Sequence, residues 1–118
     1  MKAKIFVIGS GLHTMTYAAA LAGYGYAVHE LATIDHARDA LMRGTFPHIL
    51  VIDVARTKDM ANFVRFVREE LAMPTSILVI GANAREAETA FHSGASEFLA
   101  RPAELAELLH TVQACLAI

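Results

Sequence analysis

Short hydrophobic runs alternate with amphipathic segments along the whole chain. Runs of apolar, often β-branched residues predict five buried strands, over residues 4–8, 26–31, 48–53, 76–80 and 97–100. Apolar residues with helical spacing predict five helices, over residues 12–22, 34–43, 59–72, 84–92 and 103–116. Glycine or proline follows the first four of these helices, at Gly23, Gly44, Pro74 and Gly94. The chain is therefore a strand followed by a helix, repeated five times.

This alternation predicts the α/β fold class. Helical crossovers between parallel strands are right-handed, so we expect a five-stranded parallel sheet with helices on both faces and a single domain over residues 1–118. In such sheets ligands bind at the carboxyl ends of the strands, near the point where the strand order reverses. Candidate chemistry should therefore lie where the predicted strands end, at Gly9 and Ser10, Leu31, Asp53, Gly81 and Arg101.

The composition excludes several classes of function. The 118 residues are 55% hydrophobic, and the formal net charge of -2 comes with no cluster of Lys or Arg that could bind a nucleic acid. The first hydrophobic run ends in glycine after about five residues, which is too short for a signal-peptide core or a membrane span. We therefore expect a cytoplasmic protein that binds neither nucleic acid nor a membrane.

Residues that often bind metals are scattered along the chain. Cys115 is the only cysteine, and its place in a periodic apolar segment predicts a buried free thiol in a reducing compartment. The histidines lie on different predicted elements without the spacing of a zinc site, so we expect them to be solvated or to cap helices. They are His13, His29, His36, His48, His92 and His110.

The glycine-rich loop after the first predicted strand leaves a nucleotide-binding alternative open. Gly9, Ser10 and Gly11 match the first two glycines of the dinucleotide-binding pattern G-x-G-x-x-G, and Glu30 lies close to the place of its ribose-binding acid. Thr14 stands at the third glycine, where it would crowd the helix against its strand. Tight strand-to-helix turns need glycine in any case, so a small nucleotide-binding domain is the less favoured alternative.

Five segments of the chain resemble the receiver domains of bacterial two-component response regulators. They are KIFVI at 4–8, GYGYAV at 23–28, PHILVID at 47–53, SILVIGA at 76–82 and SGASEFLARP at 93–102. The resemblance runs from end to end and implies the flavodoxin-like (βα)5 fold of CheY-like receivers. It also implies that Asp53 stands at the phosphoacceptor position, that Phe98 is the switch aromatic residue, and that Arg101 replaces the lysine of a Lys-Pro pair.

Several positions depart from the pattern that this resemblance implies. Gly9 and Ser10 stand where receivers carry two acids that hold Mg²⁺, and Gly81 stands at the place of a hydroxyl residue. Mg²⁺ takes oxygen ligands in near-octahedral geometry and is usually recruited by carboxylates together with phosphate oxygens, so Asp53 alone would hold it weakly. A transferred phosphoryl group would then lose its main charge stabiliser. We therefore expect no cofactor, no enzymatic activity, and a degenerate receiver in which phosphorylation is weak or absent. Acids restored at positions 9 and 10 should return Mg²⁺ affinity.

Asp53 accordingly has two interpretations. It is either a working phosphoacceptor or a strand-end carboxylate that is paired with a cation. For the second interpretation, the receiver layout offers Arg101 and Lys58 as partners. We favour the ion pair and keep the working phosphoreceiver as the alternative function.

The expected function is signal transduction by protein–protein contact. The resemblance implies a protein partner, such as a histidine kinase or an output domain. It also implies docking or homodimerisation through the face built from the fourth helix, the fifth strand and the fifth helix. The residues expected on this face are Arg85, Glu88, Phe98, Glu104 and Glu107.

Overall fold

The strands form one parallel sheet in the order β2-β1-β3-β4-β5, in a computed structural model that describes residues 2–117. The strands are β1 (Lys4–Ile8), β2 (Ala27–Leu31), β3 (Ile49–Ile52), β4 (Ser76–Gly81) and β5 (Glu97–Ala100). The strand order reverses at β1, because β2 adds to one side of β1 and β3, β4 and β5 follow on the other. The carboxyl ends of β1 and β3 therefore flank the place where such folds bind their ligands.

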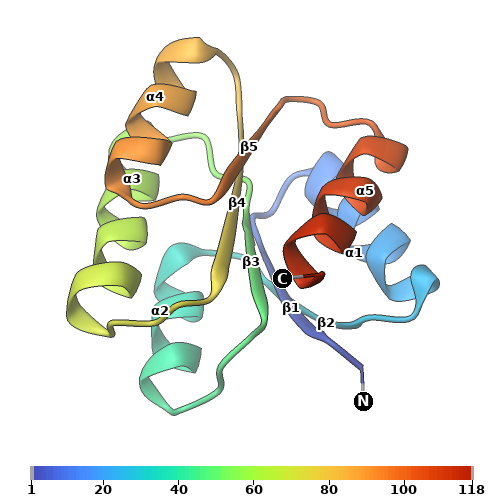
Figure 1. Cartoon of the computed structure of the whole chain (residues 1–118), viewed down its shortest axis with the longest axis horizontal. Helices are drawn as coiled ribbons and strands as arrows, with labels where there is room; N and C mark the ends of the chain where they lie inside the picture. The colour runs from blue at the N-terminus through green and yellow to red at the C-terminus, as the bar shows by residue number, and fades with distance from the viewer. Residues whose placement is uncertain (1, 118) are drawn as a thin grey trace.

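Two layers of helices cover the sheet, as the alternating sequence predicts (Figure 1). One face carries α1 (Leu12–Tyr24) and α5 (Leu105–Leu116). The other face carries α2 (Ile34–Met42), α3 (Thr57–Arg65), which continues into the π-helical segment η1 (Phe66–Glu70), and α4 (Ala84–Ser93). The predicted α/β class, with a five-stranded parallel sheet and helices on both faces, is therefore confirmed.

Strand residues alternate between the two faces of the sheet and build one hydrophobic core under each layer of helices. Phe6 and Ile8 of β1 belong to the core under α2, α3 and α4, whereas Ile5 and Val7 belong to the core under α1 and α5. All four residues of the central strand β3 are buried. Coverage on both faces explains why its sequence is a continuous hydrophobic run rather than an alternating one.

Four helix ends differ from the sequence prediction. α1 continues past Gly23 to Tyr24, and Gly25 closes it with a φ of 115°. A glycine inside a helix costs only about 1 kcal/mol, so the second glycine, which lies in the left-handed region, ends the helix instead of the first. α5 begins at Leu105 rather than at residue 103, because Ala103 is held outside the helix, where its backbone N–H donates to the Tyr17 hydroxyl at 2.8 Å.

The predicted helix over 59–72 differs at both ends, since it is α3 followed by η1, begins at Thr57 and ends at Glu70. Arg68 lies on η1, and its guanidinium ties this segment to the residues just before β4 and β5. It donates to the carbonyl oxygens of Gly94 and Met73 at 2.8 Å each and to that of Thr75 at 2.6 Å. The remaining element ends agree with the prediction within one residue.

The sequence predicts that Cys115 is buried, but in the structure this residue is half-buried. It lies in the last turn of α5, close to the edge of the core. Burial and the nearby Glu97 carboxylate raise the pKa of the thiol, and a hydrogen bond with Ser76 opposes them. Among residues 2–117, no helix has the length and hydrophobicity that a membrane crossing requires.

Candidate functional site

Asp53 follows the central strand β3 directly and lies at the carboxyl end of the sheet, as the sequence predicts. Its backbone N–H donates to the Ile8 carbonyl of β1 at 2.8 Å, which fixes the residue beside the loop between β1 and α1. The Asp53 side chain is only 7% exposed. A carboxylate this far from solvent needs partners, and the structure supplies one for each oxygen.

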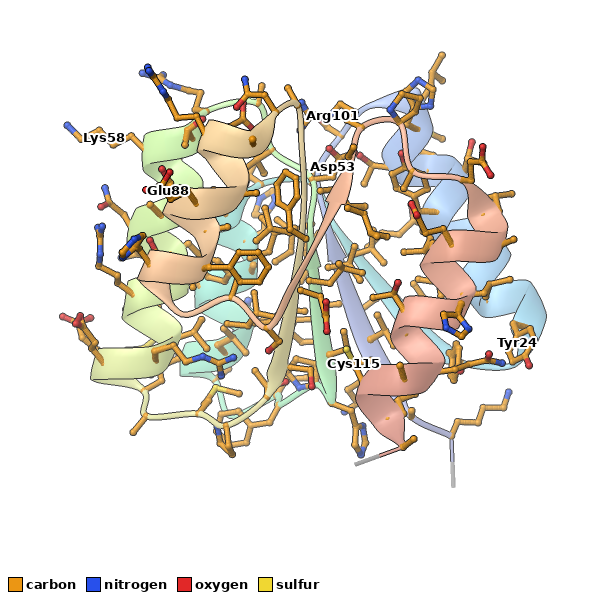
Figure 2. The ribbon with its side chains drawn as sticks, turned by 45° about the horizontal axis from the view of Figure 1, so that its top comes forward. Tyr24, Asp53, Lys58, Glu88, Arg101 and Cys115 are labelled. Carbon is orange, nitrogen blue, oxygen red and sulfur yellow. The ribbon has the colours of Figure 1, made fainter. Side chains whose placement is uncertain are left out.

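Arg101 is the cation that pairs with Asp53 (Figure 2). The Oδ1 oxygen of Asp53 accepts from Arg101 Nε at 3.0 Å and lies 2.9 Å from Nη2. Nη2 also donates to the carbonyls of Val54 and Ile80, at 3.3 Å and 3.2 Å. Lys58, the other predicted partner, is exposed and points away from Asp53. Of the two cations that the sequence offered, the structure therefore brings Arg101 to the carboxylate.

Thr14 is the second partner of Asp53, and the sequence did not indicate this role. The hydroxyl Oγ1 of Thr14 donates to Asp53 Oδ2 at 2.7 Å, and Thr14 is 3% exposed. Thr14 stands at the third glycine of the dinucleotide-binding pattern, so its side chain fills the space that this pattern keeps free. The one signal in the sequence was a polar residue on the otherwise apolar inward side of the predicted helix.

Gly9 lies too close to β3 for any side chain. Its φ is 148°, and a Cβ there would lie 2.4 Å from the Asp53 carbonyl oxygen and 2.9 Å from Thr14 Oγ1. An acid at position 9 would therefore strain the backbone and push against main-chain atoms. This overturns the expectation that acids at both positions 9 and 10 would restore a Mg²⁺ site. Only Ser10, which is exposed, has room for one.

Gly81 at the end of β4 is covered by two other side chains. A Cβ at this position would lie 2.8 Å from Cε1 of Phe98 and 2.6 Å from Oε2 of Glu86. The Glu86 carboxylate is itself held, because it accepts from the Ala82 backbone N–H at 3.1 Å. Phe98 and Glu86 therefore fill the space beside residue 81, where the receiver resemblance implies a hydroxyl-bearing side chain.

A pocket of about 430 Å³ opens onto Asp53 and Arg101, with Ser10 and His13 also in its lining. Asp53 is the one carboxylate among the residues that line it. Within residues 2–117, no group of three or more His, Cys, Asp or Glu side chains could hold a metal ion. With Asp53 as the single carboxylate in this lining, the residues present supply few of the oxygen ligands that a Mg²⁺ ion takes.

The predicted docking face lies around the edge strand β5. Arg85 and Glu88 of α4 are exposed, as are Glu104 and Glu107 at the start of α5. Phe98 is only partly exposed, because its ring packs against the core under α4. The charged residues of this face are therefore available to a partner, whereas the aromatic residue lies beneath them.

Solved structures of response regulators share this fold. A protein from Chloroflexus aurantiacus that is assigned to the response regulators is 25% identical, with a TM-score of 0.88 over 100% of both chains. The chemotaxis response regulator CheY4 of Vibrio cholerae is 22% identical, with a TM-score of 0.84 over 98% of this chain and 99% of its own. The signal receiver domain of a histidine kinase from Syntrophus aciditrophicus is 17% identical, with a TM-score of 0.81 over 98% and 90%.

No protein-family model and no curated protein matches the sequence. The likeness therefore lies in the arrangement of helices and strands, and it confirms the flavodoxin-like receiver fold that the sequence predicts.

Proposed function

We propose that the chain is an atypical receiver domain that transmits signals by protein–protein contact, with phosphorylation of Asp53 weak or absent. The engagement of both Asp53 oxygens carries the proposal. Oδ1 accepts from Arg101 and Oδ2 accepts from Thr14. A carboxylate that attacks a phosphoryl group must present an oxygen to the incoming phosphorus. Here each oxygen accepts a hydrogen bond inside the protein, which draws electron density from it and restricts the approach of a phosphoryl group.

The charges around Asp53 also disfavour phosphoryl transfer. The transferred group develops negative charge, which a metal ion and a cation normally stabilise. Arg101 is the one cation among the pocket-lining residues that pairs with Asp53, and its guanidinium also donates to two backbone carbonyls. Neither Gly9 nor Ser10 supplies a carboxylate for a metal. We therefore propose a domain with no cofactor and no enzymatic activity of its own.

The proposed partner is a protein, either a histidine kinase or an output domain. The receiver domain from Syntrophus aciditrophicus is part of a histidine kinase, so a domain of this fold can serve within one. The exposed charges of Arg85, Glu88, Glu104 and Glu107 support docking through α4, β5 and α5. We also propose that the protein is cytoplasmic, because its one cysteine, Cys115, is a free thiol, as is usual in a reducing compartment.

Phosphorylation by a small phosphodonor tests the proposal. The purified chain is incubated with acetyl phosphate and Mg²⁺, and its intact mass is measured beside that of an Asp53→Asn control. We expect no gain of one phosphate group in either protein. A gain in the wild-type chain that is absent from Asp53→Asn would overturn the proposal in favour of a working phosphoreceiver.

A second variant tests whether low phosphorylation comes from the contacts of Asp53 with Thr14 and Arg101 or from the missing acids at positions 9 and 10. Thr14→Val combined with Arg101→Lys frees Oδ2 and replaces the guanidinium fork with a point charge. Phosphate gain in this double variant, together with none in the wild type, would assign the low reactivity to the contacts of Thr14 and Arg101. No gain in either would assign it to the missing acids.

A further inference from the structure

The two helical layers carry very different numbers of charged residues. On one face of the sheet, α2, α3, η1 and α4 each contain three. On the other face, α1 contains none and α5 contains Glu107 alone. A helix that covers a sheet normally turns charged or polar residues toward water. The outward side of α1 is the exception in carrying no Asp, Glu, Lys or Arg, and its exposed polar residues are His13 and Thr16.

Exposed apolar residues form a stripe along α1. Leu12 is 81% exposed and Met15 is 56% exposed, and Ala19 and Ala22 continue the same side of the helix as exposed residues. We call these four residues the α1 stripe. Their spacing of three, four and three residues keeps them in line over about 15 Å of helix. A contiguous exposed apolar surface is a candidate contact surface.

The size of the side chains makes the α1 stripe complementary to itself. Its two large residues lie in the first half of the helix and its two alanines lie in the second. In an antiparallel pair of α1 helices around a two-fold axis, Leu12 meets Ala22 of the other copy and Met15 meets Ala19, because both pairs share one midpoint. Each large side chain then packs against a small one. A parallel pair would set Leu12 against Leu12 and leave a gap between the alanines.

We propose that the α1 stripe is the interface of a homodimer, in which a second copy of this chain lies antiparallel on it. Charge favours this occupant. Two copies of a helix without Asp, Glu, Lys or Arg meet without repulsion between such side chains, whereas a strongly acidic or basic partner finds none of them to pair with on α1. Antiparallel helices also bring opposite ends of their dipoles together. The contact lies outside the α4–β5–α5 face and does not depend on Asp53.

The length of the stripe sets the strength of the dimer. A contact one helix wide and about 15 Å long belongs with the small, weak interfaces. Association should therefore depend on concentration, with monomer at low concentration and dimer at high concentration.

Sedimentation equilibrium over a series of concentrations tests the interface. The wild-type chain should show a monomer–dimer equilibrium. Met15→Lys alone and Ala19→Glu alone should each weaken association by about tenfold or more, because each places a single charge against an apolar surface. Both changes in one chain should restore association, because each new lysine then faces the new glutamate of the other copy. An equal mixture of the two single variants should associate for the same reason.

Phe91→Lys on α4 is the matched control, because Phe91 is 49% exposed and belongs to the opposite layer. It should leave association unchanged, and circular dichroism should show that every variant folds. A wild-type chain that stays monomeric at all concentrations would overturn the proposal. So would a dimer that Phe91→Lys weakens and Met15→Lys does not, which would move the interface to α4. If the double variant fails to recover, the antiparallel register is wrong.

Discussion

Arg101 and Arg68 are partly buried arginines at opposite ends of the sheet, and they bind different kinds of partner. Arg101, at the carboxyl end, forms an ion pair with Asp53. Arg68, at the amino end, forms no ion pair within residues 2–117. Its guanidinium donates to three backbone carbonyls and one hydroxyl, those of Gly94, Met73, Thr75 and Ser96.

This difference indicates that Arg68 has a structural role, whereas Arg101 belongs to the candidate functional site. Burial lowers the pKa of the Arg68 guanidinium, but its partners are carbonyls that neither titrate nor become modified. Arg68 is therefore a fixed clamp between η1, β4 and β5. The partner of Arg101 is a carboxylate that borders an open pocket. A change in the charge of Asp53 would change what Arg101 binds, whereas no partner of Arg68 carries a charge that could change.

Loss of the Arg68 hydrogen bonds should lower the free energy of unfolding more than loss of the ion pair between Asp53 and Arg101. Arg68→Met keeps the length of the side chain but leaves the carbonyls of Met73, Thr75 and Gly94 without their donor. We expect the free energy of unfolding in urea to fall by about 2–4 kcal/mol, because hydrogen bonds to charged groups are strong and water replaces only part of them. Arg68→Lys should recover less than half of the loss, since it lacks the planar fork. A loss below about 1 kcal/mol for Arg68→Met would contradict the clamp.

Removal of the ion pair between Asp53 and Arg101 should lower the free energy of unfolding by an intermediate amount, which depends on which of the two residues remains. Asp53→Ala leaves the Arg101 cation unpaired, but this side chain is 28% exposed and water can solvate it in part. We expect a loss of about 1–3 kcal/mol. The double variant Asp53→Ala with Arg101→Met should lose less than the sum of the single changes, because it leaves no unpaired charge. Strictly additive losses, measured in the same urea series, would show that the two residues do not stabilise each other.

The hydrogen bond from Thr14 to Asp53 should contribute the least of these contacts to the free energy of unfolding. Thr14→Val keeps the shape of the side chain and removes the hydroxyl that donates to Asp53 Oδ2. We expect a loss of about 1 kcal/mol in the free energy of unfolding. Thr14→Ser retains the hydroxyl and serves as the control, with a smaller loss from the missing methyl group. Equal losses in the two variants would assign the effect to packing rather than to the hydrogen bond.

The strands could be predicted almost completely from the sequence, and four of the helix ends could not. A buried parallel strand is a continuous hydrophobic run, so each of the strands is visible in the amino-acid order. The end of α1 at Gly25 instead of Gly23 depended on which glycine adopts a left-handed φ. The π-helical winding of η1 has no signal in the sequence, nor do the contacts of Arg68 with residues that lie up to 28 positions further along the chain.

The candidate site could be predicted in part. Asp53 and Arg101 were identified by their places after two strands, and parallel strands bring such ends together. The contact of Thr14 was not indicated, because a threonine within a helix has no pattern that points to a carboxylate 39 residues away. The sequence also could not show that neighbouring atoms leave no room for a side chain at Gly9, since glycine occurs in turns with and without such crowding.

Amino-acid order was enough to establish the elements, their sequence along the chain and the residues that end each strand, because hydrophobic periodicity is a local property. The tertiary structure was needed to choose Arg101 over Lys58, to give Asp53 its second partner, and to close position 9 against a side chain. These outcomes depend on distances between separate strands and helices. Such distances exist only once the two cores have packed against the sheet.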